Sequence, residues 1–329
     1  MPTAPGVPEL SVAVPAYNEA QCLPELYDRV AAVAERVGVE WELVVADDGS
    51  TDGTRELLRA LAARDRRVKP VMLSRNFGHT PAYLAAMEHA SGEWVVVMDS
   101  DLQDEPEVIP DMLAIARTGL DVVYAIKTKR QEGVMMRAAF SLYYRLAGRL
   151  SAVPQPAHAG PFCLMSRRVV DEISRLPERN IFFPGLRSYV GFRQAGIQVE
   201  RPKRTDRTRI RLGRRVAGAL DGILAFSNVP LRISSWVGLG VAVAAGILGL
   251  VFIYYRLFTD IAVAGFTALA TILLFLGGVQ LLTLGILGEY LGRVYEEVKR
   301  RPRYIVEEVV NAERDEERES RRVLQRDGR

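Results

Sequence analysis

Two acidic residues stand two positions apart directly after an apolar run of the sequence. Asp99 and Asp101 follow the run Trp94–Met98, and Gln103 comes two residues after the second acid. Carboxylate and amide oxygens suit a hard cation, and Mg²⁺ or Mn²⁺ commonly takes one or two protein carboxylates beside substrate phosphates. Because acids in loops are often only solvated, the spacing by itself leaves both interpretations open.

Two further polar clusters also follow apolar runs. Asp47–Gly53 comes after Glu42–Ala46, and an acid there can accept a hydrogen bond from the N–H edge of a base, while its glycines allow a close approach of backbone. The alternative is a turn in which Ser50 or Asp52 caps the next helix. The third cluster, Val14–Glu19, offers a tyrosine for stacking and a glutamate for polar contacts.

These clusters need a scaffold that brings them together, and the hydrophobic pattern predicts alternating strands and helices. Strands separated by helices favour an α/β fold with a mostly parallel sheet and helices on both faces. Ligands of such sheets bind beyond the carboxyl ends of the strands, where the polar clusters stand. The predicted strands are Leu10–Val14, Glu42–Ala46, Val68–Leu73, Trp94–Met98 and Asp121–Ile126. The predicted helices are Cys22–Val37, Thr54–Arg64, Pro81–Ala90, Pro106–Thr118, Met135–Leu150 and Arg167–Ser174.

The composition is typical of a folded protein. The 329 residues are 49% hydrophobic and 25% charged, and a net charge of +3 gives no reason to expect a nucleic-acid partner. Cys22 and Cys163 show neither metal-ligand spacing nor a disulfide framework, which favours a reducing setting. The first thirty residues lack the basic start and apolar core of a signal peptide. We therefore expect the polar part of the chain to lie in the cytosol.

Two long runs without charged residues stand in the C-terminal third. Trp236–Tyr255 and Ile261–Gly288 each reach the length of about 20 residues that spans the hydrocarbon core of a bilayer. The alternative is a helical hairpin buried in a soluble core. We predict two membrane helices, over residues 236–257 and 262–289, joined by the short link Arg256–Asp260.

Basic residues flank this predicted hairpin on both sides. The positive-inside bias then places both flanks in the cytoplasm, so the protein is expected to be a multi-pass protein of the cell membrane with both termini cytosolic. The flanking residues are Arg214, Arg215 and Arg232 before the hairpin and Arg293, Lys299, Arg300, Arg301 and Arg303 after it.

Four parts follow from these patterns. Residues 1–212 form the cytosolic domain, and residues 213–235 form an interfacial helical segment beside the membrane, for which a plain connector is the alternative. Residues 236–292 hold the two membrane helices. Residues 293–329 form a charged cytosolic tail with a possible strand at Tyr304–Val310, and this tail could mediate assembly into a homo-oligomer.

The order and spacing of the three polar clusters resemble glycosyltransferase family 2. Val14–Glu19, Asp47–Thr54 and Met98–Asp104 carry the resemblance, and Leu73–Gly78 adds a fourth block. Within the family, Asp99–Asp104 is similar to the polyprenyl-phosphate branch, which includes dolichol-phosphate mannose synthases and the undecaprenyl-phosphate glucosyl- and aminoarabinosyl-type transferases. The resemblance continues through Gly185–Gln194, the two apolar runs and Gly288–Tyr295, and so covers roughly residues 8–310.

This resemblance implies a GT-A, Rossmann-like nucleotide-sugar-binding domain that uses Mg²⁺ or Mn²⁺. The implied metal ligands are Asp99, Asp101 and Gln103. The implied donor-binding residues are Pro15, Ala16, Tyr17, Glu19, Ala46, Asp48, Arg75, Asn76, Asp99 and Ser100.

The resemblance also implies that basic residues bind the phosphate groups of the substrates. Lys127 and Arg137 would act beside Asp99 and Asp101 in catalysis. The basic run of residues 201–215 has eight basic residues against one acid, and its part Arg204–Arg211 stands where the family has a phosphate-binding segment. Its alternative role is attraction to anionic lipid head groups, at about 1 kcal/mol per charge. The implied acceptor-binding residues are Arg137, Arg204, Arg207, Arg209 and Arg211.

One position departs from the family pattern. Many relatives have an aspartate after the glycine that aligns with Gly160, whereas this chain has Pro161, which puts a conventional general base in doubt. A phosphate acceptor has a second pKa near ~6 and arrives largely ionised, so it gains little from a base. Positioning and charge compensation could then supply most of the acceleration.

The expected activity is an inverting transfer of a hexose from a nucleoside-diphosphate sugar to undecaprenyl phosphate at the cytoplasmic membrane face. Uridine is favoured over guanosine in the donor because of the two-helix layout. A processive polysaccharide synthase is one alternative, but it would need more membrane helices and a Gln-x-x-Arg-Trp segment, which this sequence lacks. A catalytically silent membrane scaffold is the other, and only Pro161 favours it.

Overall fold

Residues 8–127, 159–178, 183–199 and 265–311 are described by the computed structural model, together with short stretches between 238 and 258. Contacts divide the chain into two units. One unit comprises Met1–Arg145, Val153–Ile210 and Arg301–Arg329, and the other comprises Leu146–Ala152 and Arg211–Arg300.

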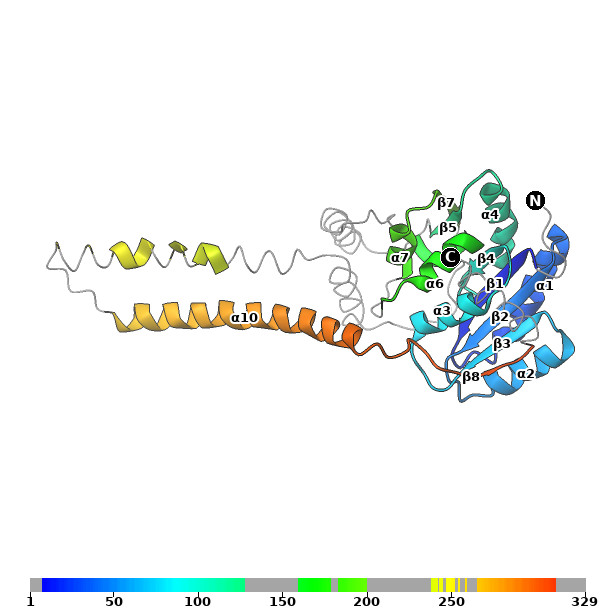
Figure 1. Ribbon diagram of the computed structural model, residues 1–329, viewed down its shortest axis with the longest axis horizontal. Coiled ribbons are helices and arrows are strands. Elements are labelled where there is room, and N and C mark those ends of the chain that lie inside the picture. The colour runs from blue at the N-terminus through cyan, green and yellow to red at the C-terminus, as the bar shows by residue number, and fades with distance from the viewer. Residues whose placement is uncertain are drawn as a thin grey trace, which may run out of the picture. The chain divides into compact units, whose positions relative to one another are not determined.

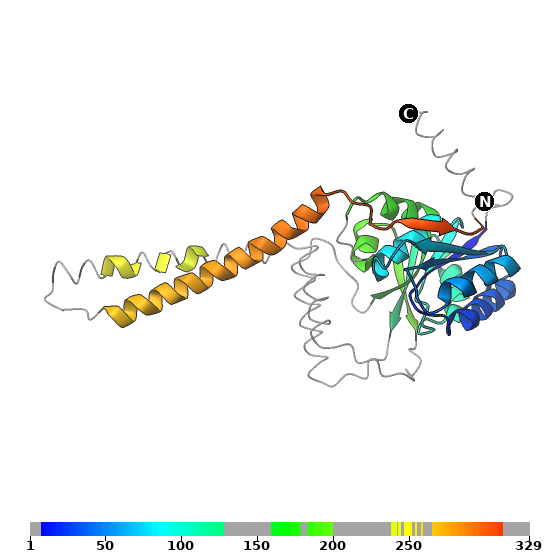
Figure 2. The ribbon, with the colours of Figure 1, turned by 90° about the horizontal axis from the view of Figure 1, so that it is seen from below.

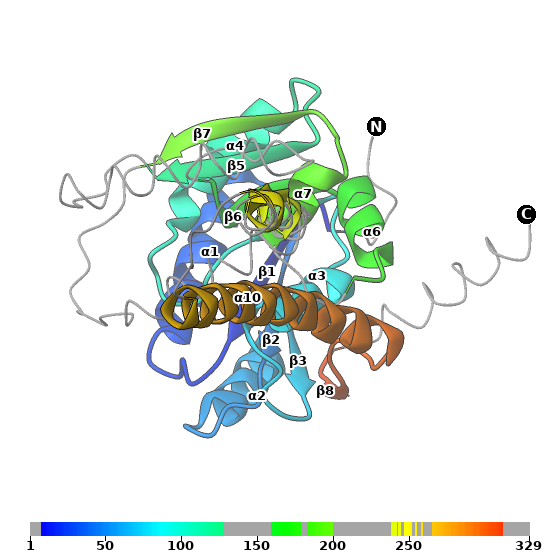
Figure 3. The same ribbon diagram turned by 90° about the vertical axis from the view of Figure 1, so that its left-hand side faces the viewer.

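An eight-stranded mixed sheet forms the centre of the first unit (Figure 1). Its strands are β1 Leu10–Ala16, β2 Trp41–Asp47, β3 Val68–Leu73, β4 Trp94–Val97, β5 Val122–Lys127, β6 Ala159–Ser166, β7 Gln194–Val199 and β8 Val306–Val309. The strand order is β7-β5-β6-β4-β1-β2-β3-β8, so β7 and β8 lie at opposite edges (Figure 3). The four central strands β4, β1, β2 and β3 are parallel, and β6 and β8 run antiparallel to their neighbours.

Short helices connect and cover these strands. They are α1 Leu23–Val37, α2 Thr54–Arg64, α3 His79–His89, the 3₁₀ turn η1 Pro106–Val108, α4 Ile109–Ala116, α6 Arg167–Arg175 and α7 Phe183–Tyr189. α1 shows why such segments become helical: its buried residues recur at helical spacing, a proline occupies its first turn, and Gly38 ends it in a left-handed conformation. The Gly38 N–H then bonds the Ala34 carbonyl, which satisfies the end of the helix.

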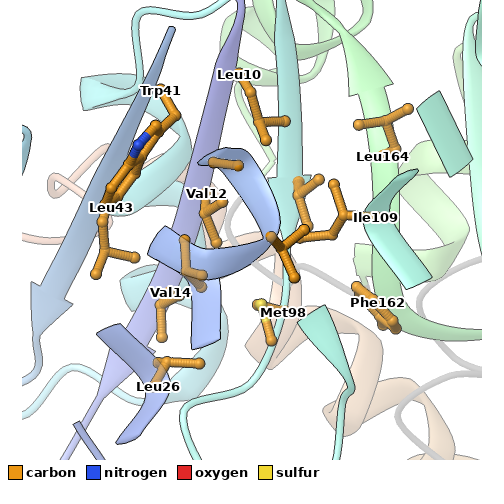
Figure 4. Packing of buried hydrophobic residues seen from close by; sticks show 14 of the residues in the cluster. Leu10, Val12, Val14, Leu26, Trp41, Leu43, Met98, Ile109, Phe162 and Leu164 are labelled. Carbon is orange, nitrogen blue, oxygen red and sulfur yellow. The ribbon is translucent and has the colours of Figure 1, made fainter. Parts of the chain in front are cut away.

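The core lies on the face of the sheet that α1 and α4 cover. Alternate residues of β1, such as Val12 and Val14, meet Leu26 of α1 and Ile109 of α4 in one cluster (Figure 4). On the other face α3 buries Tyr83 and its neighbours against β1 and β2. Because both faces are covered, every residue of β1, β2 and β3 is buried, and each buried Val or Leu side chain contributes about 1.5–3 kcal/mol.

The strands and helices predicted before residue 128 are confirmed to within two residues at each end, with one difference. The predicted helix Pro106–Thr118 is a 3₁₀ turn followed by α4, which ends at Ala116. The prediction of a strand near the C-terminus is also confirmed, as β8. The predicted helix Met135–Leu150 lies outside the described residues.

The second unit contains one long helix, α10 Phe266–Val298. Within the part of the chain that the structure describes, it is the one helix long and apolar enough to cross a membrane, over Phe275–Val298. The helix predicted over residues 262–289 therefore begins later and continues to Val298. The described residues of the predicted first membrane helix, about half of 236–257, are helical, whereas the rest of that range and all of 213–235 lie outside the described residues.

Candidate active site

The three polar clusters begin at one edge of the sheet because the strands before them are parallel and in register. Ala16 pairs with Asp47 across β1 and β2, and Ala13 pairs with Val97 across β1 and β4. The Asp48 N–H bonds the Ala16 carbonyl at 2.8 Å, which continues this alignment into the loops. The expectation that the clusters meet beyond the carboxyl ends of the strands is confirmed.

Hydrogen bonds join the loop after β1 (residues 17–22, the β1 loop) to the loop after β2 (residues 48–53, the β2 loop). The Asn18 N–H donates to Ser50 Oγ at 2.9 Å, and Asn18 Oδ1 accepts from the Thr51 N–H at 2.8 Å. Asn18 has a φ of 57°, which asparagine tolerates better than most residues. The next N–H, of Glu19, donates to Thr54 Oγ1 at 3.1 Å. The two loops therefore hold each other in place.

Asp48 joins the β2 loop to the loop after β3 (residues 74–78, the β3 loop). Its carboxylate accepts hydrogen bonds from the N–H groups of Phe77 at 2.7 Å and Gly78 at 2.9 Å. Burial raises the pKa of Asp48, and these two hydrogen bonds offset part of that rise.

Gly49 allows the same two loops to approach closely. It has a φ of +73°, and a Cβ atom there would lie 2.6 Å from the backbone of Arg75 and Asn76. Only glycine fits this position without strain. The close approach expected at these glycines therefore occurs, but the backbone that approaches is the chain's own. The alternative in which Ser50 or Asp52 caps the next helix is not borne out, because the N-cap of α2 is Gly53, which has no side-chain cap hydrogen bond. Asp52 Oδ1 instead accepts from the Thr54 N–H at 3.1 Å in a local turn.

The loop of residues 99–104 (the acidic loop) is folded around its own carboxylates. The Asp99 N–H donates to the buried Asp104 side chain at 3.2 Å, and the Gln103 N–H donates to Asp101 Oδ1 at 3.1 Å. Leu102 between them has a φ of 59°, a conformation that costs about 1–2 kcal/mol for a residue with a Cβ atom. Strain of this kind concentrates at functional sites, and here the hydrogen bond between Gln103 and Asp101 holds these two residues in one turn around Leu102.

Two side chains of α3 contact Asp99. The Tyr83 hydroxyl donates a hydrogen bond to Asp99 Oδ1, and His79 Nε2 lies 3.0 Å from the same oxygen. Burial and the Asp99 charge raise the pKa of Tyr83. Desolvation lowers the pKa of His79, but the carboxylates of Asp99, Asp101 and Asp48 more than offset it, so this pKa lies above its ordinary value.

The sequence interpretation missed both of these α3 residues. The available signal was position: His79 follows directly after the Leu73–Gly78 block, and Tyr83 is four residues further along the same helix, on the same face. Their rings pack edge to face with centroids 4.5 Å apart.

Negative charge from different loops converges on one region. Burial is the largest cause that raises the pKa of Glu19, and the charges of Asp101, Asp52 and Asp99 raise it further. These four acids come from the β1 loop, the β2 loop and the acidic loop. Carboxylates that destabilise one another in this way favour a bound cation.

The residues of the acidic loop suit a hard divalent ion that a substrate helps to hold. Among the described residues, no group of three or more His, Cys, Asp or Glu side chains is arranged to hold a metal. The two carboxylates of Asp99 and Asp101, with the Gln103 amide, offer an incomplete oxygen set. Mg²⁺ sites with one or two carboxylates are completed by waters and phosphate oxygens, so this set fits such an ion.

The remaining predicted donor residues surround these loops. Tyr17 is 47% exposed, and Arg75 stacks on the Phe77 ring at 4.0 Å while donating to the Asn76 carbonyl at 2.8 Å. Three residues of β1 and β2 are buried, and Ser100 is buried within the acidic loop itself. The strand residues are Pro15, Ala16 and Ala46.

The predicted phosphate-binding residues are not brought together by the described part of the chain. Lys127 ends β5, but its side chain lies outside the described residues. The other predicted phosphate-binding residues, which also lie outside, are Arg137, Arg204, Arg207, Arg209 and Arg211.

Comparisons of the sequence with known proteins all point to the same protein family. The model of glycosyl transferase family 2 matches residues 11–174. An uncharacterized glycosyltransferase, YkcC of Bacillus subtilis, is 39% identical over 301 residues, which cover 91% of this chain and 93% of the relative. The SfII prophage-derived bactoprenol glucosyl transferase of Shigella flexneri is 39% identical over 300 residues, covering 91% of this chain and 97% of that protein.

A solved structure is also similar. Glucosyl-3-phosphoglycerate synthase from Mycobacterium tuberculosis, in complex with uridine diphosphate, is 24% identical with a TM-score of 0.45, covering 67% of this chain and 80% of that one. The family model, the near full-length relatives and the mostly parallel mixed sheet with its acidic edge agree on a GT-A-like α/β fold and a glycosyl-transferring enzyme. The chain belongs to glycosyl transferase family 2.

Proposed function

We propose that this glycosyltransferase moves a hexose from a nucleoside-diphosphate sugar, with uridine diphosphate favoured, to a polyprenyl phosphate at the cytoplasmic face of the membrane. The observation that carries the proposal is the convergence of acids from three loops at the carboxyl edge of the sheet. Near full-length relatives that are named bactoprenol glucosyl transferases support a polyprenol acceptor.

The donor nucleoside is proposed to lie across the β1, β2 and β3 loops. The exposed Tyr17 ring offers a stacking surface for the base. Each oxygen of the Asp48 carboxylate accepts one backbone N–H and keeps lone-pair capacity for a base N–H. Arg75 and Asn76 of the β3 loop, with the buried strand residues Pro15, Ala16 and Ala46, are proposed to complete the nucleoside site.

Mg²⁺ or Mn²⁺ is proposed to be held by Asp99, Asp101 and Gln103 together with the diphosphate of the donor. When bound, the ion neutralises charge that develops on the departing nucleoside diphosphate. The Tyr83 hydroxyl and the His79 ring orient the Asp99 carboxylate toward this role. Ser100 and Glu19 complete the polar surround of the donor.

The acceptor phosphate is proposed to attack the sugar's anomeric carbon as an ionised nucleophile, with inversion. Pro161 offers no proton-accepting side chain, which suits a nucleophile that arrives deprotonated. The basic residues of the sequence prediction are proposed to position that phosphate. They are Lys127, Arg137, Arg204, Arg207, Arg209 and Arg211.

The path of the chain supports two membrane crossings. β7 ends at Val199 and β8 begins at Val306, and both belong to one sheet. Strands of one sheet lie on one side of a membrane, so the chain between them must cross it an even number of times. If α10 is one crossing, a second must lie within residues 200–265, where the first apolar run stands. A membrane hairpin with the sheet and both termini in the cytosol satisfies this condition.

The direct test incubates membranes that contain the protein with undecaprenyl phosphate, Mn²⁺ and a panel of nucleoside-diphosphate sugars. A lipid product that is heavier by one hexose, identified by mass spectrometry, is the expected result. A ladder of longer glycans would instead indicate a processive synthase. Absence of both transfer and metal-dependent donor hydrolysis would contradict the proposal and favour a silent scaffold.

A further inference from the structure

The strand that follows α10 in the chain completes the sheet beside the donor loops. β8 pairs antiparallel with β3, with Leu73 opposite Val306 (Figure 2). The pairing extends past the end of β3, because the Ser74 N–H donates to the Ile305 carbonyl at 2.9 Å. The β3 loop, which carries Arg75 and Asn76, therefore starts from a backbone that β8 holds.

One guanidinium group ties β8 to the ends of two other strands. Arg55, in the first turn of α2, donates from Nε to Asp47 Oδ2 at 2.7 Å and from Nη2 to the Leu73 carbonyl. Its Nη1 donates to Glu307 of β8 at 2.9 Å. Asp47 is the last residue of β2 and Leu73 is the last residue of β3, so Arg55 fixes the points from which the β2 and β3 loops begin.

The contact with Asp47 is the buried one. The Asp47 side chain is fully buried, the Arg55 side chain is 20% exposed, and the Glu307 side chain is 54% exposed. Burial lowers the pKa of Arg55, but the carboxylates of Asp47 and Glu307 more than offset it. Asp47 thus provides the strong anchor, and Glu307 orients the far end of the guanidinium from the outside.

We propose that Arg55 is a positioning residue for the donor nucleotide, and that Glu307 makes donor binding depend on the strand that returns from the membrane helix. This proposal rests on the proposed donor site. Asp48 directly follows Asp47, and Gly49 packs against the backbone of Arg75 and Asn76. A shift of either strand end therefore changes the spacing between Asp48 and the β3 loop, and preorganised spacing of this kind sets affinity.

Other contacts hold β8 in place without Glu307. The Tyr304 hydroxyl donates to Glu88 of α3, and the Arg303 guanidinium lies 3.6 Å from the same carboxylate. Asn311 Nδ2 donates to the carbonyls of Ala62 and Val68. A substitution at Glu307 therefore detaches Arg55 from β8 while β8 stays paired with β3, which separates positioning from folding.

The neighbouring residue supplies a matched control. Glu308 pairs with Arg59 at 2.7 Å on the same strand and the same helix, but neither of these residues contacts a donor loop in the described part of the chain. Glu308→Ala removes the ion pair of a glutamate that is exposed to a similar degree as Glu307, and it leaves the hydrogen bonds of Arg55 in place.

The test measures the dissociation constants of UDP and GDP, each with Mn²⁺, for the full-length protein in nanodiscs, and the steady-state constants for donor and undecaprenyl phosphate. We expect Glu307→Ala to raise the nucleotide dissociation constant and the donor KM about threefold, with acceptor KM and kcat unchanged. Arg55→Lys, which cannot reach three acceptors at once, should raise both about tenfold. Glu308→Ala should change neither.

The outcomes separate the two proposals. If the parent protein binds neither nucleotide, the proposed function fails and this inference falls with it. If the parent binds a nucleotide but Glu307→Ala and Glu308→Ala behave alike, or if Glu307→Ala raises the acceptor KM as much as the donor KM, then only the positioning role is overturned. Because Glu307 is largely exposed, this comparison stands even where an Arg55 variant fails to fold.

Discussion

The hydroxyl group of Tyr83 donates a hydrogen bond to the carboxylate of Asp99, so a buried tyrosine of α3 fixes the first acid of the acidic loop. The Tyr83 ring is itself held by Phe183 of α7, which stacks on it with centroids 5.8 Å apart. The packing of α7 against Tyr83 of α3 therefore helps to set the orientation of the Asp99 carboxylate. Where a partner of this kind orients a metal ligand, its substitution typically weakens metal affinity about 10–100-fold.

Replacing Tyr83 by phenylalanine should weaken metal use more than folding. Tyr83→Phe keeps the ring stack but leaves Asp99 without its hydroxyl donor, so the Mn²⁺ concentration for half-maximal transfer should rise about tenfold. The loss of one hydrogen bond should lower the unfolding free energy by about 1 kcal/mol. Tyr27→Phe removes a comparable bond to Asp65, at 2.8 Å, and serves as the control. Equal Mn²⁺ dependence in the two variants would contradict the role of Tyr83.

Gly49 and Gly53 allow a matched comparison in the β2 loop. Both have positive φ values, but a Cβ atom at Gly49 would collide with the β3 loop, whereas one at Gly53 meets nothing within 4 Å. Gly53→Ala should cost about 1–2 kcal/mol from backbone strain alone. Gly49→Ala should cost about 3 kcal/mol or more, because overpacking adds to the strain. Thermal unfolding in detergent measures both, and a Gly49→Ala variant as stable as Gly53→Ala would refute the close contact.

The amino ends of the strands contain a buried ion pair that should make stability depend on pH. Lys69 Nζ lies 3.6 Å from Glu42 Oε2, and both side chains are buried. Burial raises the pKa of Glu42, but the Lys69 charge and hydrogen bonds from Ser11 and Ser91 more than offset it, so this pKa lies below its ordinary value. A carboxylate with a lowered pKa stabilises the fold above its unfolded-state pKa of about 4.3, and that stability is lost as the pH falls through the folded-state pKa.

Glu42→Gln tests this linkage. At pH 7 the variant should be less stable than the parent by about 3 kcal/mol, because the Lys69 charge stays buried without a counter-charge. Below a pH of about 4.3 the difference should shrink, because the unfolded parent then takes up a proton at Glu42, and it should vanish once the pH falls below the lowered folded-state pKa. Unfolding curves at several pH values measure the difference. A difference that does not change with pH would show that the Glu42 charge contributes nothing.

Cysteine accessibility tests the two membrane crossings. In a variant without the native cysteines, a cysteine introduced by Thr259→Cys in the short link should react with an impermeant maleimide added outside intact cells. One introduced by Thr51→Cys in the exposed β2 loop should react only after lysis. Labelling of both from the same side would contradict the hairpin.

Elements with strong local signals could be predicted from the sequence, and those that depend on distant partners could not. The apolar runs Val12–Val14 and Leu43–Ala46 are followed by Pro15 and Asp47, so β1 and β2 could be predicted. β7 contains Gln194 and Gln198, and Gly196 packs against the side chain of Ile126, so this half-buried edge strand has no strong pattern of its own.

The candidate site also combines residues that a local sequence signal predicts with residues that only distant contacts bring into place. Asp99 and Asp101 follow an apolar run at a characteristic spacing, and the resemblance to a family supplied their implied roles. The contacts of Tyr83 with Asp99, and of Arg55 with Glu307, join residues that only the folded sheet brings together. No local pattern predicts them, because an arginine or tyrosine on a helix is equally consistent with solvent exposure or core packing.

The central claim is that the acidic loop binds a divalent ion jointly with the donor's diphosphate, and Mn²⁺ binding followed by electron paramagnetic resonance tests it most directly. Asp101 is exposed, so Asp101→Asn should fold as the parent does. The parent should bind Mn²⁺ at least about tenfold more tightly with UDP present than without it, because phosphate oxygens complete the coordination. Asp101→Asn should lose that gain. Mn²⁺ affinity that is indifferent to UDP in the parent, or unchanged in the variant, would contradict the account.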